Sequence, residues 1–579
     1  MSKLLRFLEP YRWLLVASII LAVGQVSANL YLPNLMSDIV NKGIAASNTN
    51  FILQTGGWMV LVAIGGTVFA IIGVYLASLV ATGMSKSLRA EIFAKIQQFS
   101  LHEFNVFGTA SLITRTTNDT TQIQQVMVMI LSLIITAPIT LVVGTILALD
   151  QDVKLAWTLI AIMPALIGLI IFLLIKAVPL FTEMQKRIDK LNLIINEKLV
   201  GVRVIRAFNR NQYEEARFDL ANHNVTDVAI KVNQVIATMM PVMKFLINIS
   251  SISIIWFGSH RVAGGHLEIG AMFAFLQYAM QILFSLLMVA LLFIMIPRAE
   301  ASAKRIFEVL DTDPTIKDPK IPNKSFELHG QIEFQNVTFT YEGAENPAIS
   351  NISFIALPGK VTAILGGTGS GKSAFVNLIP RFYDVTKGKI LVDGIDVREM
   401  SQVDLRSRIG YISQKAKLFS GTIKDNLRFG RENATDEEIY HAATVAQASE
   451  FIANMPDTYD SFISEGGTNV SGGQKQRLSI ARALVLKPEI YVFDDTFSAL
   501  DFKTDAKLRA ALKKETQNST VIIVAQRIST VLDADQIIVL EDGKMAGIGT
   551  HGELMKSNRV YQNIARSQLS EDEIKKEIL

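Results

Sequence analysis

The chain has 579 residues, a mean hydropathy of +0.33 and a formal net charge of +3. Half of its residues are hydrophobic and only 19% are charged, which is too apolar for an ordinary soluble enzyme and indicates membrane spans. The small net charge argues against a nucleic-acid partner. The absence of cysteine excludes disulfides, thiolate metal sites and a cysteine nucleophile.

Six apolar stretches before residue 300 are long enough to cross about 30 Å of hydrocarbon as helices. They span residues 13–35, 57–81, 127–149, 155–178, 236–258 and 269–296. The preceding segment, residues 1–12, mixes charged and apolar side chains without a signal-peptide cleavage pattern, so we expect a short interfacial helix there. Only residues 150–154 join the third span to the fourth, which predicts a tight hairpin.

Two long connections, after the second span and after the fourth, have the pattern of helical arms with few helix breakers. Amphipathic stretches cover residues 84–98, 113–127, 180–199 and 211–232. At about 1.5 Å per residue, each arm reaches about 25–30 Å beyond the bilayer. The turns between paired arms, residues 102–108 and 208–211, are candidates to dock on a soluble domain.

The basic residues predict the orientation of these spans. Both long connections are rich in Lys and Arg, whereas the short connections carry few. Basic residues concentrate on the cytoplasmic side of membrane proteins, so we expect the long connections in the cytoplasm. This distribution predicts a multi-pass protein of the cell membrane whose soluble part is cytoplasmic.

Lys244 is the clearest ionisable group inside a span, and such groups are candidates for function. It could contact a substrate, snorkel, or face a wet cavity. The fifth and sixth spans also carry many methionines, which offer a soft and adaptable surface for a promiscuous pocket, although ordinary packing is the alternative. These methionines are Met239, Met240, Met243, Met272, Met280, Met288 and Met295.

The domain order follows from composition. Residues 13–310 form the predicted transmembrane domain, whose last part, residues 298–310, is a charged helix that leaves the membrane. Pro314 helps to end this helix, and a polar linker covers residues 311–325. The soluble domain is predicted at residues 326–566, followed by a charged tail at 567–579 that reads as a solvated helix end.

A glycine-rich loop follows an apolar strand-like run at residues 361–365 and leads into an apolar segment of helical character. The loop has the form G-x-x-x-x-G-K-[ST] and includes Gly366, Gly369, Gly371, Lys372 and Ser373. Its glycines let backbone N–H groups cradle phosphates, and the helix that follows adds the positive end of its dipole. Lys372 supplies a charge for the β- and γ-phosphates, and the Ser373 hydroxyl can ligate Mg²⁺.

Further motifs occur downstream of this loop. An apolar run, residues 490–493, ends in Asp494, a carboxylate suited to hold Mg²⁺. Gln414 follows another predicted strand and could reach Mg²⁺ or the attacking water. A second glycine-rich helix start follows Val470 and offers a second phosphate-binding surface. It comprises Ser471, Gly472, Gly473 and Gln474.

Together these residues resemble the motifs of ATP-binding-cassette (ABC) transporters. The Walker A motif resembles residues 366–373, and the Q-loop resembles Gln414 with its neighbours. The signature resembles residues 471–474, the Walker B motif residues 493–494 and the D-loop residues 498–501. Tyr341 looks like the A-loop aromatic. Six spans followed by such a cassette in one chain resemble a half-transporter with the type IV exporter fold. The resemblance implies an all-α transmembrane domain followed by an α/β P-loop cassette.

The resemblance also implies a dimer that binds ATP and Mg²⁺. Two cassettes would sandwich two ATP molecules, each between the phosphate loop of one chain and the signature of the other. The resemblance further implies that the turns near Phe104 and Phe208 are coupling helices seated on the cassettes. It also implies that Asp501 of the D-loop is a catalytic residue.

Two positions depart from the family's pattern. Asp495 stands where the residue after the Walker B aspartate is usually Glu, and Gln526 stands at the position of the H-loop histidine. Asp is one methylene shorter than Glu and falls short of the attacking water as a general base. Gln is not the titratable, cationic partner that His can be near the γ-phosphate. Both changes affect hydrolysis and leave the ATP-binding residues in place.

We therefore expect one half of a heterodimer, similar to the degenerate half of a bacterial multidrug exporter. The signature is intact except for Val470 in place of the usual Leu, and it would serve a competent site in a homologous partner with Glu and His. A homodimer with two slow sites is the alternative. The expected substrates are hydrophobic or amphipathic small molecules, with a lipid or peptide flippase or exporter, or a non-transporting ATP sensor, as competing hypotheses.

Overall fold

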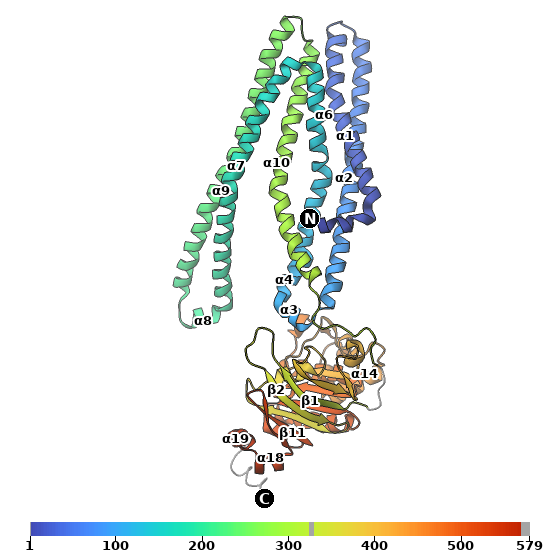
Figure 1. The fold of residues 1–579 in the computed structure, drawn as a ribbon, viewed down its shortest axis with the longest axis vertical. Helices are drawn as coiled ribbons and strands as arrows, with labels where there is room; N and C mark the ends of the chain where they lie inside the picture. The colour runs from blue at the N-terminus through green and yellow to red at the C-terminus, as the bar shows by residue number, and fades with distance from the viewer. Residues whose placement is uncertain (1, 324–328, 569–579) are drawn as a thin grey trace. The chain divides into compact units, whose positions relative to one another are not determined.

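The computed structural model describes residues 2–323 and 329–568 (Figure 1). The chain divides into two compact units. One comprises the residues up to Gln97 together with Gly108–Asp313, and the other comprises Gln98–Phe107 together with the residues from Pro314 onward. The predicted start of the soluble domain at residue 326 lies outside the described residues, as does all of the predicted tail except Ser567 and Gln568.

The described residues of the first unit form helices joined by short turns. Six helical runs among them are long and apolar enough to cross a membrane, which confirms the predicted all-α transmembrane domain. Its elements are η1 (Ser2–Tyr11), α1 (Arg12–Asp38), η2 (Ile39–Ile44), α2 (Thr49–Gln97), α4 (Thr109–Thr114), η3 (Arg115–Asp119), α5 (Thr120–Met129), η4 (Ile130–Ile134), α6 (Thr136–Gln151), α7 (Val153–Val200), α8 (Val202–Ala207), α9 (Asn211–Ala263) and α10 (Ile269–Asp311). Several spans continue as one helix into the predicted arms. The hairpin between α6 and α7 turns at Asp152, whose side chain caps α7 by accepting from the N–H of Leu155.

The helices α7 and α9 run side by side and are joined by the short helix α8 (Figure 1). The sequence predicted the turn between these arms at residues 208–211. The short helix lies just before that range, and Phe208 is the residue that ends it. Residues 208–210 form the turn itself and α9 begins at Asn211, so α8 is a short helix that immediately precedes the predicted turn. Every residue of α8 is exposed or half-buried.

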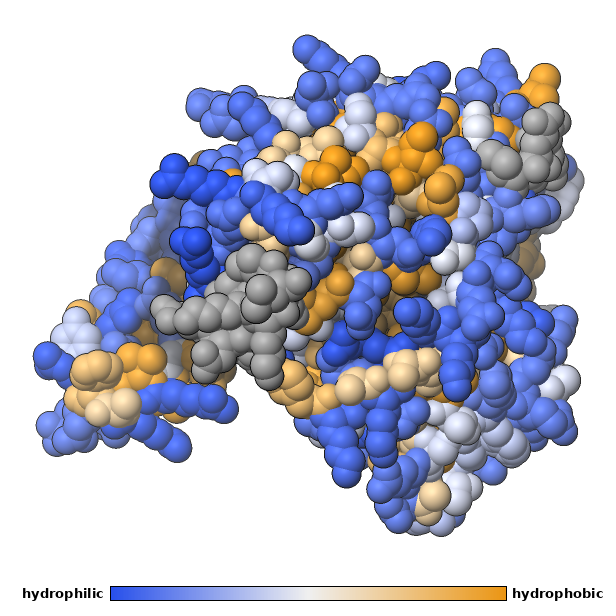
Figure 2. Space-filling model, turned by 90° about the horizontal axis from the view of Figure 1, so that it is seen from below, coloured by the Kyte–Doolittle hydropathy of each residue, from blue (hydrophilic) through white to orange (hydrophobic). Residues whose placement is uncertain are grey.

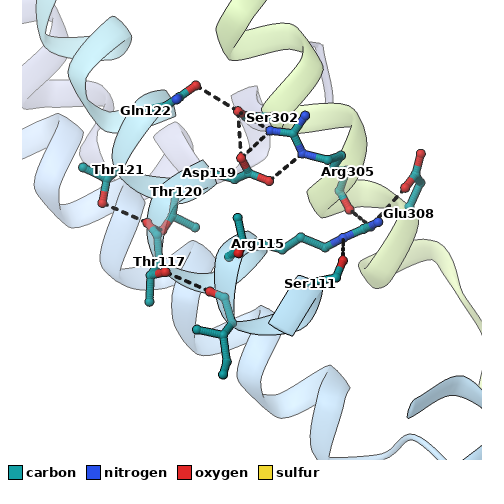
Figure 3. Close-up of polar contacts among 12 residues, drawn as sticks. Ser111, Arg115, Thr117, Asp119, Thr120, Thr121, Gln122, Ser302, Arg305 and Glu308 are labelled. Carbon is teal, nitrogen blue, oxygen red and sulfur yellow. Dashed lines mark hydrogen bonds and ion pairs between the residues drawn. The ribbon is translucent and has the colours of Figure 1, made fainter. Parts of the chain in front are cut away.

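A polar network joins the arm after α4 to the end of α10 (Figure 3). Asp119, which is 2% exposed, accepts from the guanidinium of Arg305 at 2.8 Å and from the Ser302 hydroxyl at 3.0 Å. Arg115 donates to the Glu308 carboxylate at 3.0 Å and to the Arg305 carbonyl. The π-helical segment η3 begins at Arg115 and ends at Asp119. These contacts tie the arm at residues 113–127 to α10 near the point where α10 ends.

The second unit contains the short helix α3 (Leu101–Phe107) and the cassette. Its strands are β1 (Ile332–Phe339), β2 (Ile349–Ala356), β3 (Val361–Gly366), β4 (Lys387–Val392), β5 (Ile395–Asp396), β6 (Ile409–Ile412), β7 (Gly421–Thr422), β8 (Phe462–Ile463), β9 (Ile490–Asp494), β10 (Thr520–Ala525), β11 (Gln536–Glu541) and β12 (Lys544–Gly549). Its other helices are α11 (Lys372–Leu378), α12 (Gln402–Ser407), α13 (Ile423–Arg428), α14 (Asp436–Val445), α15 (Ser449–Ala453), α16 (Gly472–Leu486), α17 (Phe502–Glu515), α18 (His551–Ser557) and α19 (Arg559–Gln568).

A six-stranded sheet in the order β12-β11-β3-β10-β9-β6 carries the cassette's motifs. From β11 to β6 neighbouring strands are parallel, and β12 is antiparallel at the edge. Strands β3, β9 and β10 are nearly continuous apolar runs, as expected for parallel strands covered on both faces. An antiparallel sheet, β2-β1-β4-β5, packs its aromatic residues Phe334 and Phe354 against Phe375 of α11.

The face of the molecule seen in Figure 2 is largely hydrophilic, with apolar side chains in smaller patches between the charged ones. Within the cassette, two clusters of buried apolar side chains lie on either side of the six-stranded sheet: Ile523 and Phe493 belong to one, and Ile522 and Val492 to the other. Adjacent residues of one strand point to opposite faces, so each strand contributes to both clusters. The central strands of the sheet are therefore buried on both faces.

Candidate functional site

Four parallel strands of the six-stranded sheet end at the same edge, and each is followed by a predicted motif. The register pairs Leu365 with Ala525, Asp494 with Val524, and Phe493 with Ile412. The phosphate loop follows β3, Gln526 follows β10, Asp494 ends β9, and Gln414 comes shortly after β6. The carboxyl ends of parallel strands are where ligands bind in such sheets. The sheet therefore brings these residues together.

The phosphate loop has a backbone that side chains would obstruct. Gly369 and Gly371 have φ of +83° and +95°, a conformation that other residues rarely adopt. A Cβ on Gly371 would lie 2.5 Å from the Ala348 carbonyl oxygen, whereas a Cβ on Gly369 would meet no described atom within 4 Å. The loop is thus tight on its protein side and open on the other. Ser373 lies in the first turn of α11, which begins at Lys372.

Lys372 lies across the loop and is 9% exposed. Its Nζ donates to the carbonyl oxygens of Gly366 and Gly367 at 2.7 and 2.6 Å. Burial lowers the pKa of this ammonium, and the charges of Asp495 and Asp494 oppose that shift. The amine is therefore held in a buried position next to the carboxylates that end β9.

Asp494 and Asp495 lie in different hydrogen-bonding environments. Asp494 Oδ2 is 3.4 Å from the Tyr411 hydroxyl, which also donates to Asn377 Oδ1 at 3.1 Å. Asp495 Oδ2 accepts from two amides, Gln526 Nε2 at 2.8 Å and Gln414 Nε2 at 3.1 Å. We call this three-residue arrangement the amide clamp. It joins the loop after β6 to the loop after β10 through a single carboxylate oxygen.

Burial raises the pKa of both carboxylates, each of which is 8% exposed. For Asp494 the hydrogen bond from Tyr411 works in the opposite direction. For Asp495 the hydrogen bond from Gln414 and the charge of Lys372 do so. Asp495 also has a left-handed backbone, with φ of +46°, which is uncommon for a residue other than glycine.

These residues fit a magnesium nucleotide. The open glycine loop at the start of α11 suits phosphates, and hydroxyl, carboxylate and amide oxygens are the ligands that Mg²⁺ prefers. At this edge of the sheet Ser373 supplies a hydroxyl, Asp494 a carboxylate and Gln414 an amide oxygen. Two buried carboxylates that accompany one buried lysine also leave an excess of negative charge that a cation would balance.

The signature residues begin α16 with a capping box. Ser471 Oγ accepts from the Gln474 N–H at 3.3 Å, and Gln474 Oε1 accepts from the Ser471 N–H at 2.8 Å. A Cβ on Gly473 would lie 3.4 Å from the Ala499 carbonyl oxygen, whereas one on Gly472 would meet no described atom within 4 Å. Among the described residues, no hydrogen bond joins this segment to the phosphate loop.

Asp501, the last residue of the predicted D-loop, caps α17. Its Oδ1 accepts from the Thr504 N–H at 3.0 Å, and this hydrogen bond lowers its pKa. The cap fixes the direction in which the chain leaves the segment after Asp495. Asp501 therefore follows the Walker B strand closely in the sequence, but it is not part of the amide clamp.

Tyr341 lies beside α3. Its ring packs edge-on against Phe339 at 4.7 Å and Tyr383 at 5.4 Å between centroids, and it is 38% exposed. It lines a cavity of about 460 Å³ together with His102 and Asn105 of α3. An exposed aromatic face next to this cavity is suited to stack on a base.

Side chains of α3 hold it against this part of the cassette. His102 Nε2 is 3.0 Å from Glu342 Oε2, and Asn105 Nδ2 is 3.4 Å from the Tyr383 hydroxyl. Burial raises the pKa of Glu103, but hydrogen bonds from Thr315 and Ser100 outweigh it and lower that pKa to about 2. The turn predicted to dock on a soluble domain therefore packs next to Tyr341.

Sequence reasoning missed two features of this site. Tyr411 has no place in the predicted motifs, although an aromatic residue three positions before Gln414 on the strand that ends at the site could have signalled it. The direct contact between Gln526 and Asp495 was also missed, because the two residues are 31 positions apart. The parallel pairing of β9 and β10 is the signal that predicts their proximity.

Comparisons with known proteins agree with this architecture. The family model described as ABC transporter transmembrane region matches residues 15–286, and the one described as ABC transporter matches residues 349–498. The structure of a bacterial Atm1-family ABC exporter with ATP bound is similar, with a TM-score of 0.81 and 26% identity. The similarity covers 97% of this chain and 99% of that one.

Related sequences extend over almost the whole chain. A protein of Mycobacterium tuberculosis named uncharacterized ABC transporter ATP-binding protein is 41% identical over 98% of each chain. The putative multidrug export ATP-binding/permease protein YgaD of Bacillus subtilis is 31% identical over 97% of this chain and 98% of its own. The ATP-dependent lipid A-core flippase of Syntrophus aciditrophicus is 32% identical over 87% of this chain and 83% of its own. The chain therefore belongs to the ABC transporter family, as a half-transporter with the exporter fold that carries one transmembrane region and one cytoplasmic ATP-binding domain.

Proposed function

We propose that this half-transporter is one subunit of a heterodimeric, ATP-driven exporter that moves hydrophobic or amphipathic compounds out of the cell. Its own Walker motifs form a site that binds ATP with Mg²⁺ and hydrolyses it slowly. Its signature completes a second site, whose Walker motifs, glutamate and histidine belong to a homologous partner. Hydrolysis takes place mainly at that second site.

The amide clamp is the observation that carries this proposal. A general base must bring a free lone pair within hydrogen-bond reach of the water it activates. Asp495 is one methylene shorter than Glu, and its Oδ2 already accepts from Gln526 and Gln414. Gln526 cannot accept and return a proton as a histidine can. The two substitutions thus support each other in an arrangement suited to retention of ATP.

The groups needed for binding are all present. Tyr341 offers a stacking surface for the base, and Lys372 offers a charge for the phosphates. Ser373, Asp494 and Gln414 would hold Mg²⁺, which when bound neutralises phosphate charge. A site with intact binding groups and altered hydrolytic groups is expected to keep its nucleotide through many turnovers.

The signature supports the role given to the partner. Gly472 has open space on its Cβ side, so no described neighbour within the chain requires glycine there. Close approach of another molecule's backbone or phosphates is a common reason for glycine at a helix start. In this proposal the other molecule is the nucleotide bound by the partner, and Ser471, Gly473 and Gln474 face it as well.

Transport follows from closure of the two cassettes on ATP. Helices α3 and α8 and the arms that carry them would pass this closure to the spans, whose cavity then opens outward. Hydrolysis at the partner's site would reset the cycle. ATP retained at the degenerate site would keep the cassettes partly in contact between cycles.

A small hydrophobic compound is the preferred substrate class, and the name of YgaD as a putative multidrug export protein supports it. Lipid or peptide transport is the second candidate, and the lipid A-core flippase among the relatives supports the lipid part of it. ATPase activity stimulated by drugs and by lipids, measured on the same preparation, separates the two classes.

The test compares the purified full-length chain, alone and with its copurified partner, in lipid vesicles. Alone, the chain should bind a fluorescent ATP analogue and hydrolyse ATP slowly, whereas the pair should hydrolyse it rapidly and export a fluorescent dye. Rapid hydrolysis and export by the chain alone would overturn the heterodimer. A pair that binds ATP without any export would favour the non-transporting sensor, and two equally slow sites in an exporting homodimer would favour the homodimer.

A further inference from the structure

One face of α9 carries polar side chains at membrane depth. Lys244, Asn248 and Ser251 are spaced i, i+4 and i+7, so they lie on one side of the helix. All three fall within the predicted fifth span, residues 236–258. Lys244 and Asn248 are exposed, and Ser251 is half-buried. We call this the polar face of α9.

The two neighbouring faces of α9 have different characters. One neighbouring face is packed against other helices and includes Met243, Ile247 and Ile254. Met243 and Ile247, for example, belong to the same apolar cluster as Leu166 of α7. On the other side Phe245, Ile249, Ile252 and Trp256 form an apolar stripe, and their side chains are 62%, 38%, 65% and 64% exposed. The apolar stripe suits contact with lipid. The polar face therefore lies between a packed face and an apolar one.

No acidic side chain within the predicted spans balances the charge of Lys244. The six predicted spans contain no Asp or Glu. Within residues 2–323 and 329–568, no ion pair involves Lys244, and no side-chain hydrogen bond involves Asn248. Charged groups at this depth are rare and face a cavity or a charged partner. An anionic molecule bound at this face would therefore meet a cation that no acidic group of the spans pairs.

The depth of Lys244 indicates where that molecule lies. Lys244 is eight positions from residue 236, which is about 12 Å along the helix axis. Because α9 begins next to α8, in the cytoplasmic part of the chain, this depth is in the cytoplasmic half of the bilayer. A headgroup there would come from the inner leaflet or from the cytoplasm.

Lys176, the other lysine within a span, differs in two ways. It is two positions before the end of the predicted fourth span, close enough to the interface for its ammonium to reach water. Its Nζ also lies 4.9 Å from the centroid of the Phe172 ring, a favourable cation–π distance. Lys176 therefore has an environment of its own and serves as a matched control.

We propose that the polar face of α9 binds the anionic headgroup of an amphiphilic substrate, with Lys244 as the charge partner and Asn248 as a hydrogen-bond donor beside it. Lys244 offers three donors and Asn248 two. The hydroxyl of Ser251 donates its only proton to the Ile247 carbonyl at 3.0 Å, so Ser251 adds polarity beside the site and the donors come from Lys244 and Asn248. The acyl chain of the substrate would lie along the apolar residues beside this face. This inference rests on the proposed exporter function and narrows its substrate class.

The test measures binding directly, so it does not depend on ATP hydrolysis. Radiolabelled oleate is titrated against the full-length chain in neutral maltoside micelles, with oleyl alcohol and oleylamine as competitors of equal chain length. Oleate should bind and should be displaced by excess unlabelled oleate but poorly by oleylamine. Lys244→Gln should weaken oleate binding about tenfold, as expected for loss of a charge-assisted hydrogen bond.

Three further variants make the result decisive. Lys244→Arg should retain binding, which excludes misfolding as the cause of a loss. Lys244→Glu should reverse the preference toward oleylamine, and Lys176→Gln should bind oleate like the wild type. Equal binding of oleate by wild type and Lys244→Gln, or binding that is indifferent to headgroup charge, would overturn the proposal.

Competition with phosphatidylglycerol separates the two sources of the headgroup. Displacement of oleate by this lipid at micromolar concentration points to inner-leaflet phospholipid, and its failure to compete points to single-chain acids. Oleate binding in a chain that never exports with any partner would contradict the proposed function alone. Export without charge-selective binding would contradict this site alone.

Discussion

Gln526 Nε2 donates a hydrogen bond to Asp495 Oδ2 at 2.8 Å, so the two residues that depart from the family's usual pattern are in direct contact. Each substitution suits the other. The amide of Gln526 always has N–H groups to donate, and the short carboxylate of Asp495 is within their reach. A neutral histidine could donate from only one ring nitrogen. The pair is therefore a unit, and its members should not be treated as independent losses.

The first prediction concerns restoration of hydrolysis. Asp495→Glu combined with Gln526→His should raise ATP hydrolysis by the purified chain at least about tenfold, because general base catalysis contributes about 10²–10⁴-fold. Each single variant should gain much less, since residues in contact show non-additive effects. Phosphate release under saturating Mg²⁺ and ATP is the measurement.

Two controls belong to that experiment. Adding Lys372→Ala should abolish the gain, which would assign the activity to this site. If the double variant hydrolyses ATP no faster than wild type, the defect lies outside the amide clamp, and the proposed division of labour loses its main support.

The structure shows which features of the fold and of the candidate site could be predicted from the sequence. The phosphate loop, Asp494 and the six helical runs were all predictable, because local motifs and long apolar stretches specify them. The contact between Gln526 and Asp495 depends on the pairing of β9 and β10, which brings together residues 31 positions apart. Side-chain networks such as that of Asp119 require the three-dimensional arrangement.

The second prediction tests whether the signature acts in another chain's site. Gly472→Ala should fold normally, because its Cβ would meet no described atom within 4 Å and its φ is not in the left-handed region. In the heterodimer, however, it should lower ATP hydrolysis about tenfold or more by obstructing the partner's nucleotide. ATP binding by the chain alone should not change.

Gly552→Ala is the matched control, since Gly552 is also near the start of a helix and also has open space on its Cβ side. It should leave the activity of the pair unchanged. Full activity of the Gly472→Ala pair would indicate that no nucleotide approaches this signature closely.

The third prediction concerns pH and Tyr411. Burial raises the pKa of Asp494, and the hydrogen bond from Tyr411 lowers it by stabilising the charged carboxylate. Tyr411→Phe removes that bond, so the pKa should rise further. Because Mg²⁺ requires the deprotonated carboxylate, Mg²⁺-dependent ATP binding should be lost at a higher pH on acidification than in wild type.

Binding of a fluorescent ATP analogue, with and without Mg²⁺, measured from pH 8 downward, checks this shift. Binding in the absence of Mg²⁺ serves as the internal control and should be similar in both proteins. An acid limit that stays at the same pH in Tyr411→Phe would mean that Tyr411 does not influence Asp494.

The fourth prediction concerns the network in Figure 3. Asp119→Ala leaves Arg305 and Ser302 without their shared acceptor, and Asp119 is 2% exposed. Loss of one member of a buried charged pair is costly, but the side chain of Arg305 is 45% exposed and can turn to water, so we expect a free-energy loss of about 1–3 kcal/mol. The apparent melting temperature of the solubilised chain should fall accordingly.

Asp227→Ala is the comparison, because Asp227 lies on α9 and its carboxylate pairs at 3.6 Å with the exposed side chain of His223. Exposed pairs contribute little, so the melting temperature of Asp227→Ala should stay close to that of wild type.

Asp119→Ala should also weaken the link between the arm at residues 113–127 and α10. Substrate should then stimulate ATP hydrolysis by the heterodimer less, while basal hydrolysis remains. A variant with unchanged stability and full stimulation would show that Asp119 carries neither role.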